Sequence, residues 1–355
     1  MKEKLLLSPK QVKPSFRNWT VKGVLNPGGI RLASKKILLM ARVAEEAPMH
    51  KGKSMHCPVI ASKTKYKARM ERISPEAIRR KEGNTLFLKN GTCRLTTVSH
   101  LRKIVLDKSG FETEKISQKP DFTGTETLGR YGVEDARITR LGKEYAMTFA
   151  SISHNEGVST ELALSKDLRK WKRQGIIFRE QNKDVVIFPE KINGKFVALH
   201  RPEGNFVFSK PSIWISYSKD LIYWGKEKSI VQPRKGWEEE RIGGGTVPIK
   251  TKEGWLEIYH GVRKSGKKRV YSAGALLLGL KNPEKIIARS PAKKPLFAPE
   301  KGFERKGFVN NVVFPTAAIL DLNKKDLLVY YGAADSRIAV KKMALKDILN
   351  SMVYE

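Results

Sequence analysis

The chain has 355 residues, with 69 lysines and arginines against 36 acidic residues, and therefore a formal charge of +33. Its hydrophobic content of 40% is that of a globular protein and argues against a disordered chain. No apolar run reaches the roughly 18 residues of a membrane span, and two cysteines, Cys57 and Cys93, are too few for a disulfide framework. These features predict a cytoplasmic protein with no membrane partner.

The positive charge is the most unusual property of the composition. Such a charge attracts anions, among them nucleic acids and phosphorylated small molecules. The lysines are scattered through every segment, however, and the sequence has no helix-turn-helix pattern, zinc-finger spacing or RNP-like strand. We therefore interpret the charge as a solvated surface and expect no nucleic-acid partner. The alternative is a scaffold that binds nucleic acid through its charge, and such binding would weaken steeply with salt.

Two segments in the first third of the chain depart from the pattern of the rest. Residues 1–20 are predicted to be an N-terminal extension, because two prolines interrupt any long helix. Residues 44–92 are irregular and are predicted to be an insertion in the first repeat. Within it, Ser74-Pro75-Glu76 has the N-cap serine and first-turn proline with which a short helix begins.

Five stretches share one pattern: a short apolar strand, a turn rich in Gly, Lys or Asn, and a second strand. Alternating apolar residues on both sides of a polar turn predict a β-hairpin. Polar or glycine-rich residues precede each stretch. The five stretches are residues 29–43, 136–149, 188–202, 248–261 and 316–332. Radial repetition of such hairpins predicts an all-β fold, a five-bladed β-propeller over residues 21–341, whose repeat entries meet at one axis.

A second repeat supports the first. Residues 165–171 and 218–224 both read Ser-Lys-Asp-Leu-x-x-Trp, 53 residues apart. An Asp in such a turn can bond back to its own backbone, so we interpret Trp171 and Trp224 as structural residues. At the end of the chain, residues 342–355 carry apolar residues at helical spacing and are predicted to form a short C-terminal helix.

The charged groups at the repeat entries are the candidates for chemistry. Carboxylates beside cations and aromatic residues in one pocket suit carbohydrate chemistry with an anion present. The candidates are Asp135, Arg137, Lys183, Asp184, Arg201, His260 and Asp335. Each also has a structural interpretation: the histidines could be buried core residues, and Arg201 could pair with Glu190 or Glu203.

Six ordered motifs carry a resemblance to a known family. YGVEDARIT resembles the Gly-Val-Glu-Asp-Pro-Arg signature of glycoside hydrolase family 130, the β-mannoside phosphorylases and β-mannosidases. NKDVVIFPEKINGKFVALHRP, WISYSKDLIYWG, RIGGGTVPI, GWLEIYHGV and NNVVFPTAAIL with YYGAAD resemble its other motifs. The resemblance covers roughly residues 20–340 and implies a five-bladed propeller.

The resemblance also implies roles for individual residues. Asp135 would be the general acid, although Ala136 replaces the family's proline. The implied sugar ligands are Lys183, Asp335, His100, Asp184, Asn26 and Arg42. The implied phosphate ligands are Arg137, His200, Arg201, Tyr259 and His260. We expect no metal and no cofactor, with inorganic phosphate as co-substrate.

The choice between phosphorylase and hydrolase depends on the nucleophile. An inverting hydrolase needs a second carboxylate about 6.5–9.5 Å from the acid to activate water, whereas phosphate arrives ionised and needs cations. The motifs keep a basic cluster and no clear second base, which favours inverting phosphorolysis of β-mannosides to α-mannose 1-phosphate.

The glycosidic linkage of the substrate and the oligomeric state are indicated less directly by the sequence. The motifs are most like the branch acting on β-1,2-mannobiose or oligomannan. A β-1,4-mannooligosaccharide or mannosylglucose phosphorylase, an inverting β-mannosidase and a non-catalytic sugar-binding propeller are the alternatives. The terminal segments could act as contact arms, so a homo-oligomer remains a hypothesis.

Overall fold

The computed structural model describes residues 2–48, 54–64, 66–204, 208–266 and 268–355. Over these ranges the chain is all-β, as predicted: antiparallel strands form five sheets of four or more strands and two smaller sheets. The helical segments are short, namely η1 (Pro9–Gln11), η2 (Pro75–Ala77), α1 (Gly302–Arg305) and α2 (Leu345–Asn350). Among the described residues, no helix has the length and apolar character needed to cross a membrane.

The five large sheets follow one another along the chain, and each contains a hairpin at or beside a predicted one. In the third sheet the first strand of the hairpin is Asn182–Ile187, which ends before the predicted stretch 188–202 begins. The first holds β2 (Thr20–Arg31), β3 (Ile37–Glu46), β9 (Thr97–Leu106) and β10 (Thr113–Ile116); the second holds β11 (Val133–Leu141), β12 (Glu144–Ser153), β13 (Gly157–Ser165) and β14 (Lys172–Phe178). The third holds β15 (Asn182–Ile187), β16 (Phe196–Pro202), β17 (Ile213–Ser218) and β18 (Trp224–Val231). The fourth holds β19 (Arg241–Gly243), β20 (Ile249–Lys250), β21 (Trp255–Ser265), β22 (Lys268–Leu278), β23 (Ile286–Arg289) and β27 (Val353–Tyr354). The fifth holds β24 (Val313–Leu320), β25 (Asp326–Ala333), β26 (Arg337–Ala344) and β1 (Lys2–Leu7).

The N-terminus completes the fifth sheet. β1 pairs with β26 in the strand order β1-β26-β25-β24. Leu6 and Leu7 are buried in the same apolar cluster as Ile338 and Val340 of β26. The prediction that residues 1–20 form an extension outside the β domain is therefore wrong, because strand pairing and burial of these leucines join the first strand to the last sheet.

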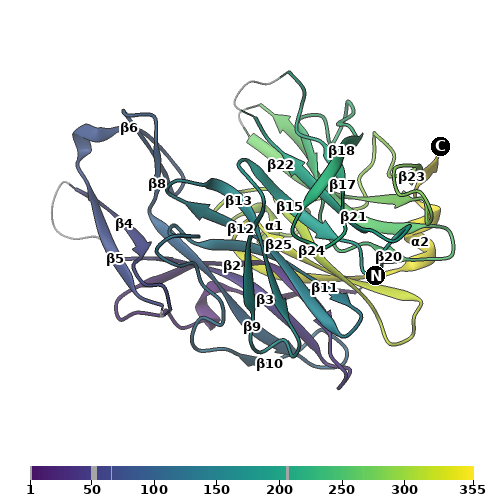
Figure 1. Cartoon of the computed structure of the whole chain (residues 1–355), viewed down its shortest axis with the longest axis horizontal. Helices are drawn as coiled ribbons and strands as arrows, with labels where there is room; N and C mark the ends of the chain where they lie inside the picture. Colours follow the sequence, from purple (N-terminus) through teal and green to yellow (C-terminus); the bar gives the residue numbers. More distant parts are fainter. Residues whose placement is uncertain (1, 49–53, 65, 205–207, 267) are drawn as a thin grey trace.

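The predicted insertion forms a separate lobe between β3 and β9. Its described strands make one sheet of β4 (Met55–Ile60) and β5 (Ala68–Ile73) and a second of β6 (Ile78–Glu82), β7 (Thr85–Leu88) and β8 (Cys93–Leu95). Figure 1 shows this lobe projecting from the body of the molecule. The helix predicted from Ser74 is only the single turn η2: the Ser74 hydroxyl bonds to the Glu76 carboxylate and not to the backbone, and β6 follows directly.

The C-terminal helix is shorter than predicted. β26 continues to Ala344, α2 covers Leu345–Asn350, and β27 then pairs with β23. Ile348, Leu349 and Met352 are buried in the core between the fourth and fifth sheets. The spacing of apolar residues therefore predicted a helix that packs against this chain's own core. The helix is short because paired strands, β26 and β27, come before and after it.

The repeated Ser-x-Asp turns have the predicted geometry. Asp167 Oδ1 accepts the backbone N–H groups of Arg169 and Lys170 at 2.8 and 2.9 Å, and Asp220 makes the equivalent two bonds at 2.9 Å each. Trp171 and Trp224 are partly buried against the apolar clusters of their sheets. Their structural interpretation agrees with this packing.

The core is divided among the spaces between sheets. Separate clusters lie between the first and second sheets, the second and third, the third and fourth, and the fourth and fifth. A further cluster joins the fifth sheet to the first, with members such as Ile319 and Val24. The first strands also meet, since β2 contacts both β11 and β24, and β11 contacts β15. Residues from four of the five large sheets, the first, second, third and fifth, are therefore brought together where these strands meet.

Candidate active site

Three predicted site residues lie at β-bulges in the first strands of successive sheets. The pairing registers of β2, β11 and β15 shift where Asn26, Asp135 and Asp184 stand, and these residues have φ angles of 43°, 53° and 59°. Asn and Asp adopt this left-handed conformation more readily than other non-glycine residues. A bulge changes the direction in which side chains point. In each of these three sheets, the bulge therefore gives one polar side chain a direction that differs from the regular alternation of the strand.

The carboxylate of Asp135 is held by residues of the first sheet. Asn26 Nδ2 donates to Asp135 Oδ1 at 3.0 Å, and Arg42 Nη1 donates to the same oxygen at 3.3 Å. Arg42 Nη2 lies 2.6 Å from Glu134 Oε1, and its Nε donates to the Ser99 hydroxyl at 3.1 Å. The Asp135 side chain is 13% exposed. It is therefore fixed in orientation and still accessible.

Burial and charge act together on the groups around Arg42. Burial disfavours the Arg42 cation, but the carboxylates of Glu134, Asp135 and Asp335 outweigh this effect and raise its pKa. Burial raises the pKa of Glu134 and that of Asp335, against the lowering effect of Arg42. Two carboxyl groups beside Asp135 therefore keep a proton to higher pH than exposed carboxyls do.

A second cluster surrounds Asp184. Arg201 Nε donates to Asp184 Oδ2 at 2.7 Å, Arg137 Nη2 lies 3.7 Å from Oδ1, and His260 Nε2 lies 3.8 Å from Oδ2. Although burial opposes ionisation, Arg201 and the neighbouring cationic groups hold the pKa of Asp184 well below its usual range. Asp184 is therefore an anion that orients two guanidinium groups from different sheets.

Donor atoms in this cluster are left unused. Arg137 Nε and Nη1 donate to the backbone carbonyls of Gly245 and Asp135, both at 2.6 Å. Arg137 Nη2 and His260 Nδ1 are buried and have no hydrogen-bond partner among the described residues. Burial lowers the pKa of His260 to about 3, so its imidazole is neutral and keeps one N–H. A small anion would satisfy the free Arg137 Nη2 donor, and His260 Nδ1 as well in the tautomer that carries its proton there.

Lys183 lies between the two clusters. It lines a small cavity together with Asp135 and Asp184. Its positive charge acts on Glu134 and Asp335 in the first cluster and on Asp184 in the second. The Asp135 group and the Asp184 group are therefore parts of one continuous site.

Gly243, Gly244 and Gly245, which precede β20, leave the space in which the side chains of the Asp184 cluster come together. A Cβ atom on Gly243 would lie 2.5 Å from His260 Cε1, 2.7 Å from Asp184 Oδ2 and 2.8 Å from Arg201 Nε. Any larger residue would displace at least one of these groups. Glu257 on β21 adds a buried carboxyl, whose Oε1 accepts the backbone N–H of Gly245 at 3.0 Å.

His200 lies apart from these groups. Its Nδ1 contacts the Asn182 side chain at 2.9 Å, its Nε2 contacts the Ser216 hydroxyl at 2.7 Å, and its ring stacks on Phe178 with centroids 4.4 Å apart. Burial lowers its pKa to about 4. Both ring nitrogens are thus occupied within the third sheet, as in a structural histidine.

His100 and Tyr259 also belong to other networks. His100 Nε2 accepts a hydrogen bond from Arg102 Nε at 2.9 Å, and its Nδ1 contacts the Tyr66 hydroxyl at 3.1 Å. The Tyr259 hydroxyl donates to Glu238 at 2.5 Å. Both side chains are fully buried. Their polar atoms are therefore already paired within the protein.

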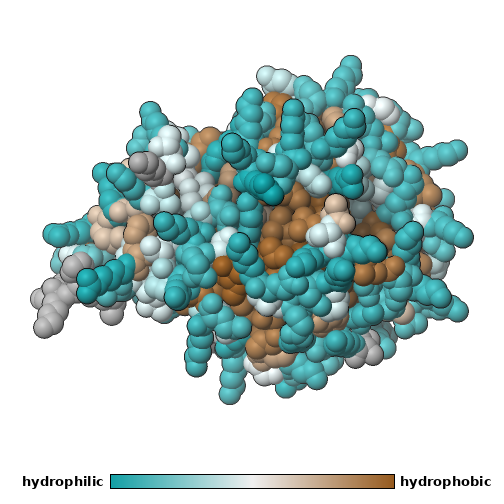
Figure 2. All heavy atoms as spheres, turned by 90° about the horizontal axis from the view of Figure 1, so that it is seen from below, coloured by the Kyte–Doolittle hydropathy of each residue, from teal (hydrophilic) through white to brown (hydrophobic). Residues whose placement is uncertain are grey.

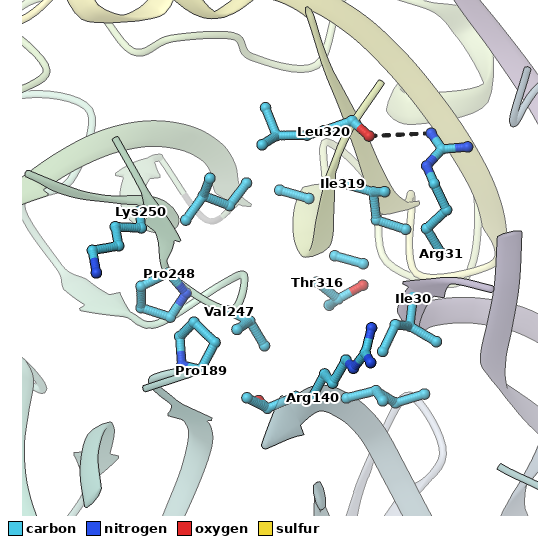
Figure 3. A pocket seen from close by; sticks show the side chains of 16 residues that line it. Ile30, Arg31, Arg140, Pro189, Val247, Pro248, Lys250, Thr316, Ile319 and Leu320 are labelled. Carbon is cyan, nitrogen blue, oxygen red and sulfur yellow. Dashed lines mark hydrogen bonds between the residues drawn. The ribbon is translucent and has the colours of Figure 1, made fainter. Parts of the chain in front are cut away.

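An apolar cavity of about 370 Å³ lies at the other ends of the same first strands. It is lined by Ile30, Ile138, Val247 and Ile319, among others, with Arg140 at its edge (Figure 3). The space-filling view from below shows an apolar hollow ringed by hydrophilic side chains (Figure 2). This cavity is larger than the one lined by Asp135 and Asp184, but no carboxylate lines it, and the Asp135 and Asp184 clusters lie elsewhere. The polar clusters are therefore the candidate site.

The chain is similar to known proteins along nearly its whole length. The profile of glycoside hydrolase family 130, described as beta-1,4-mannooligosaccharide phosphorylase, matches residues 97–354. The beta-1,2-mannobiose phosphorylase of Listeria innocua is 35% identical over 358 residues, covering 99% of this chain and 98% of that protein. The chain belongs to glycoside hydrolase family 130.

Two further family 130 relatives extend the comparison. The 1,2-beta-oligomannan phosphorylase of Thermoanaerobacter is 42% identical over 221 residues, 61% of this chain and 70% of that protein. The structure of the Listeria innocua beta-1,2-mannobiose phosphorylase in complex with beta-1,2-mannobiose superposes with a TM-score of 0.88 at 34% identity, covering 99% of both chains. The fold and nearly the whole length are therefore shared with a family member solved with a sugar.

Sequence reasoning missed some groups of this family 130 site. Glu257 follows two apolar residues of GWLEIYHGV and has the appearance of an ordinary strand residue, yet it is buried beside Arg137 and Asp184. The charged residue inside an otherwise apolar strand was the available signal.

Proposed function

We propose that the protein catalyses the inverting phosphorolysis, and the reverse synthesis, of β-1,2-linked mannobiose and oligomannan. The observation that carries the proposal is the placement of an accessible carboxylate, Asp135, next to buried cations organised by Asp184. Asp135 is suited to protonate a departing oxygen, and the buried cations are suited to bind an oxyanion. The relatives named as β-1,2-mannoside phosphorylases support the linkage.

The reaction balances as follows. An oxygen of hydrogen phosphate attacks C1 of the terminal β-mannosyl unit, so that a C1–O–P bond forms while the C1–O bond to the next sugar breaks. Asp135 supplies the proton to the departing oxygen. The proton of the phosphate then restores Asp135. The products are α-mannose 1-phosphate and an oligosaccharide one unit shorter.

The Asp184 cluster is assigned to phosphate. Arg137 and Arg201 offer guanidinium groups, His260 a neutral ring nitrogen and Lys183 a flexible cation. Phosphate prefers such donors, and Arg can bind it in bidentate fashion. We leave His100, His200 and Tyr259 out of the site, because their polar atoms have other partners.

The same cluster disfavours hydrolysis. A hydrolase would need a free carboxylate to activate water. Glu203 contacts Arg201 and also lies 3.3 Å from Arg241 Nη1. Burial raises the pKa of Glu257 to about 8, so near pH 7 this carboxyl is protonated and cannot accept a proton. Neither group suits the role of the base.

The proposal extends to the arrangement of the five large sheets. We infer that the five large sheets are the blades of a five-bladed β-propeller, with β1 completing the last blade. Supporting this are the apolar clusters between consecutive sheets, including the one that joins the fifth sheet to the first. Closure of this kind would place the bulges of β2, β11 and β15 around one axis.

Incubation with β-1,2-mannobiose, with and without phosphate, tests the function. We expect mannose 1-phosphate and mannose in a one-to-one ratio, and turnover only when phosphate is present. β-1,4-mannobiose in a parallel reaction is the linkage control and should react far more slowly. Release of free mannose alone, independent of phosphate, would show a hydrolase and refute the proposal.

A further inference from the structure

Arg42 on β3 lies between two consecutive carboxyl groups of β11. Its Nη2 is 2.6 Å from Glu134 Oε1, whereas its Nη1 is 3.3 Å from Asp135 Oδ1. Consecutive residues of a regular strand point to opposite faces, but the pairing register of β11 shifts between Glu134 and Arg137, and Asp135 has a φ of 53°. The bulge therefore brings both carboxyl groups to one guanidinium, which they share unequally.

Ser99 on β9 fixes the orientation of this guanidinium. Its hydroxyl oxygen accepts the Arg42 Nε–H at 3.1 Å, and the same hydroxyl donates to Glu134 Oε1 at 3.2 Å. Ser99 is 1% exposed and forms a β-bridge with Gly132, where a Cβ atom would lie 2.6 Å from the Ser99 backbone nitrogen. The start of β11 and the middle of β9 thus lie close together, so Ser99 and Glu134 bind Arg42 from adjacent, fixed positions.

The unequal sharing matters because a general acid must carry a proton before the reaction. An arginine in close contact with a carboxylate stabilises the anion and so weakens the acid. At Arg42 the short contact goes to Glu134, and attraction between charges falls with distance. The 3.3 Å contact to Asp135 lies beyond the roughly 2.7–3.2 Å of ordinary N–H···O bonds, so it orients the carboxyl without making it the principal partner of an ion pair.

Other charged groups also face the Asp135 carboxyl. They are, by element, Asp335 after β25, Arg137 of β11, and Lys183 and Asp184 of β15. Two of them are acidic and two are basic, so their effects partly offset one another. Among the described residues, Arg42 is the cation that hydrogen-bonds to the Asp135 carboxyl. The share of its charge that another carboxyl compensates therefore has the largest effect on the acid.

We propose that Glu134 and Ser99 are positioning residues that hold the Arg42 guanidinium away from the general acid, leaving Asp135 free to carry the proton that it transfers. This inference rests on the proposed function. Ser99 prevents the guanidinium from turning, and Glu134 compensates its charge once this carboxyl is ionised. Because burial raises the pKa of Glu134, at lower pH it acts through its hydrogen bonds alone.

The pH dependence of the two directions of the reaction tests this role. In phosphorolysis Asp135 must be protonated, so activity falls on the alkaline side; in synthesis it must be ionised to take the acceptor's proton, so activity falls on the acidic side. For Glu134→Gln we expect both of these falls to move to lower pH by about one unit, because a neighbouring negative charge is lost. The ionisation of phosphate is the same for every variant and cancels in the comparison.

Ser99→Ala is the second variant, and it decides the question if Glu134→Gln does not fold. Without the hydroxyl, the Arg42 guanidinium can turn towards Asp135, so both falls in activity should again move to lower pH, by a smaller amount. A general loss of structure would instead lower kcat at every pH. For either variant, profiles that keep their position, or that move to higher pH, overturn the proposal.

Two control variants make the same substitutions elsewhere in the second sheet. Glu161→Gln weakens a buried contact with Arg173 Nη1 at 2.8 Å, and Ser151→Ala removes a buried hydroxyl that has no hydrogen-bond partner within the described ranges. Both should leave the two pH profiles in place. A control that moves them as far as Glu134→Gln does would show that the effect is not specific to Arg42 and would overturn the proposal.

A direct titration separates failure of this inference from failure of the proposed function. If the wild type shows no turnover, NMR of protein labelled at its aspartate carboxyl groups still reports the pH at which Asp135 loses its proton, with Asp135→Asn identifying the signal. Glu134→Gln should lower that pH by about one unit. An unchanged value refutes the role of Glu134, whatever the activity.

Discussion

Glu257 is a buried carboxyl whose ionisation should be readable in the stability of the protein. Burial raises its pKa to about 8 from the usual 4.5, and the backbone N–H of Gly245 and the cation of Arg137 offset this only in part, while Asp184 adds to it. The folded protein therefore keeps this proton at pH values where the unfolded chain has lost it. Substitution by glutamine removes the titration and keeps an acceptor for Gly245.

The sign and size of the effect follow from linkage. Below about pH 4.5 the carboxyl is protonated in both states, and its contribution to stability is complete. As the pH rises towards about 8, the unfolded chain releases the proton first and stability is lost at about 1.4 kcal/mol per pH unit. The glutamine variant should not show this loss. Relative to wild type, Glu257→Gln should therefore gain roughly 3 kcal/mol between about pH 5 and pH 7.

Urea unfolding of both proteins across this pH range is the assay. Glu134 and Asp335 also have raised pKa values, because of burial, but they titrate in both proteins and cancel in the difference. Glu253→Gln, at an exposed position of the preceding turn, is the matched control and should give a difference that does not vary with pH. A difference for Glu257→Gln that is also constant with pH would refute the reasoning.

Further predictions concern the candidate site and the stability of the sheets that support it. Asp135→Asn should lose nearly all turnover in both directions; substantial residual activity would remove Asp135 from its role as acid. Arg201→Ala should raise the KM for phosphate by about 10- to 100-fold, with little change in the KM for mannose as acceptor. His200→Ala should lower the free energy of unfolding by about 2–3 kcal/mol in urea and leave the phosphate KM within about twofold; a large rise in that KM would return His200 to the anion site. Leu7→Ala should cost about 2–4 kcal/mol by the same assay, because β1 belongs to the last sheet; a loss below about 0.5 kcal/mol would mean that the N-terminal strand is dispensable.

Local patterns predicted the repeating units well. Alternating apolar residues around polar turns identify the five hairpins, since the side chains of a strand alternate between two faces whatever the strand later packs against. The Ser-x-Asp turns are also local, because their hydrogen bonds stay within a few residues of Asp167 and Asp220. The candidate site residues Asn26, Asp135 and Asp184 can also be read locally, as polar residues at the repeat entries, and each lies where a strand bulges.

Strand pairs and side-chain contacts between residues far apart in the chain became known only from the tertiary structure. No local pattern states that Lys2–Leu7 pairs with β26, or that His200 bonds within its own sheet while His260 approaches Asp184. The raised pKa of Glu257 comes from burial, and its charged neighbours Arg137 and Asp184 belong to other sheets. By itself, the sequence predicted the repeating hairpins, the family and a candidate acid, Asp135. Folding decided which cations and rings surround that acid, because burial and long-range contact exist only after the sheets have packed together.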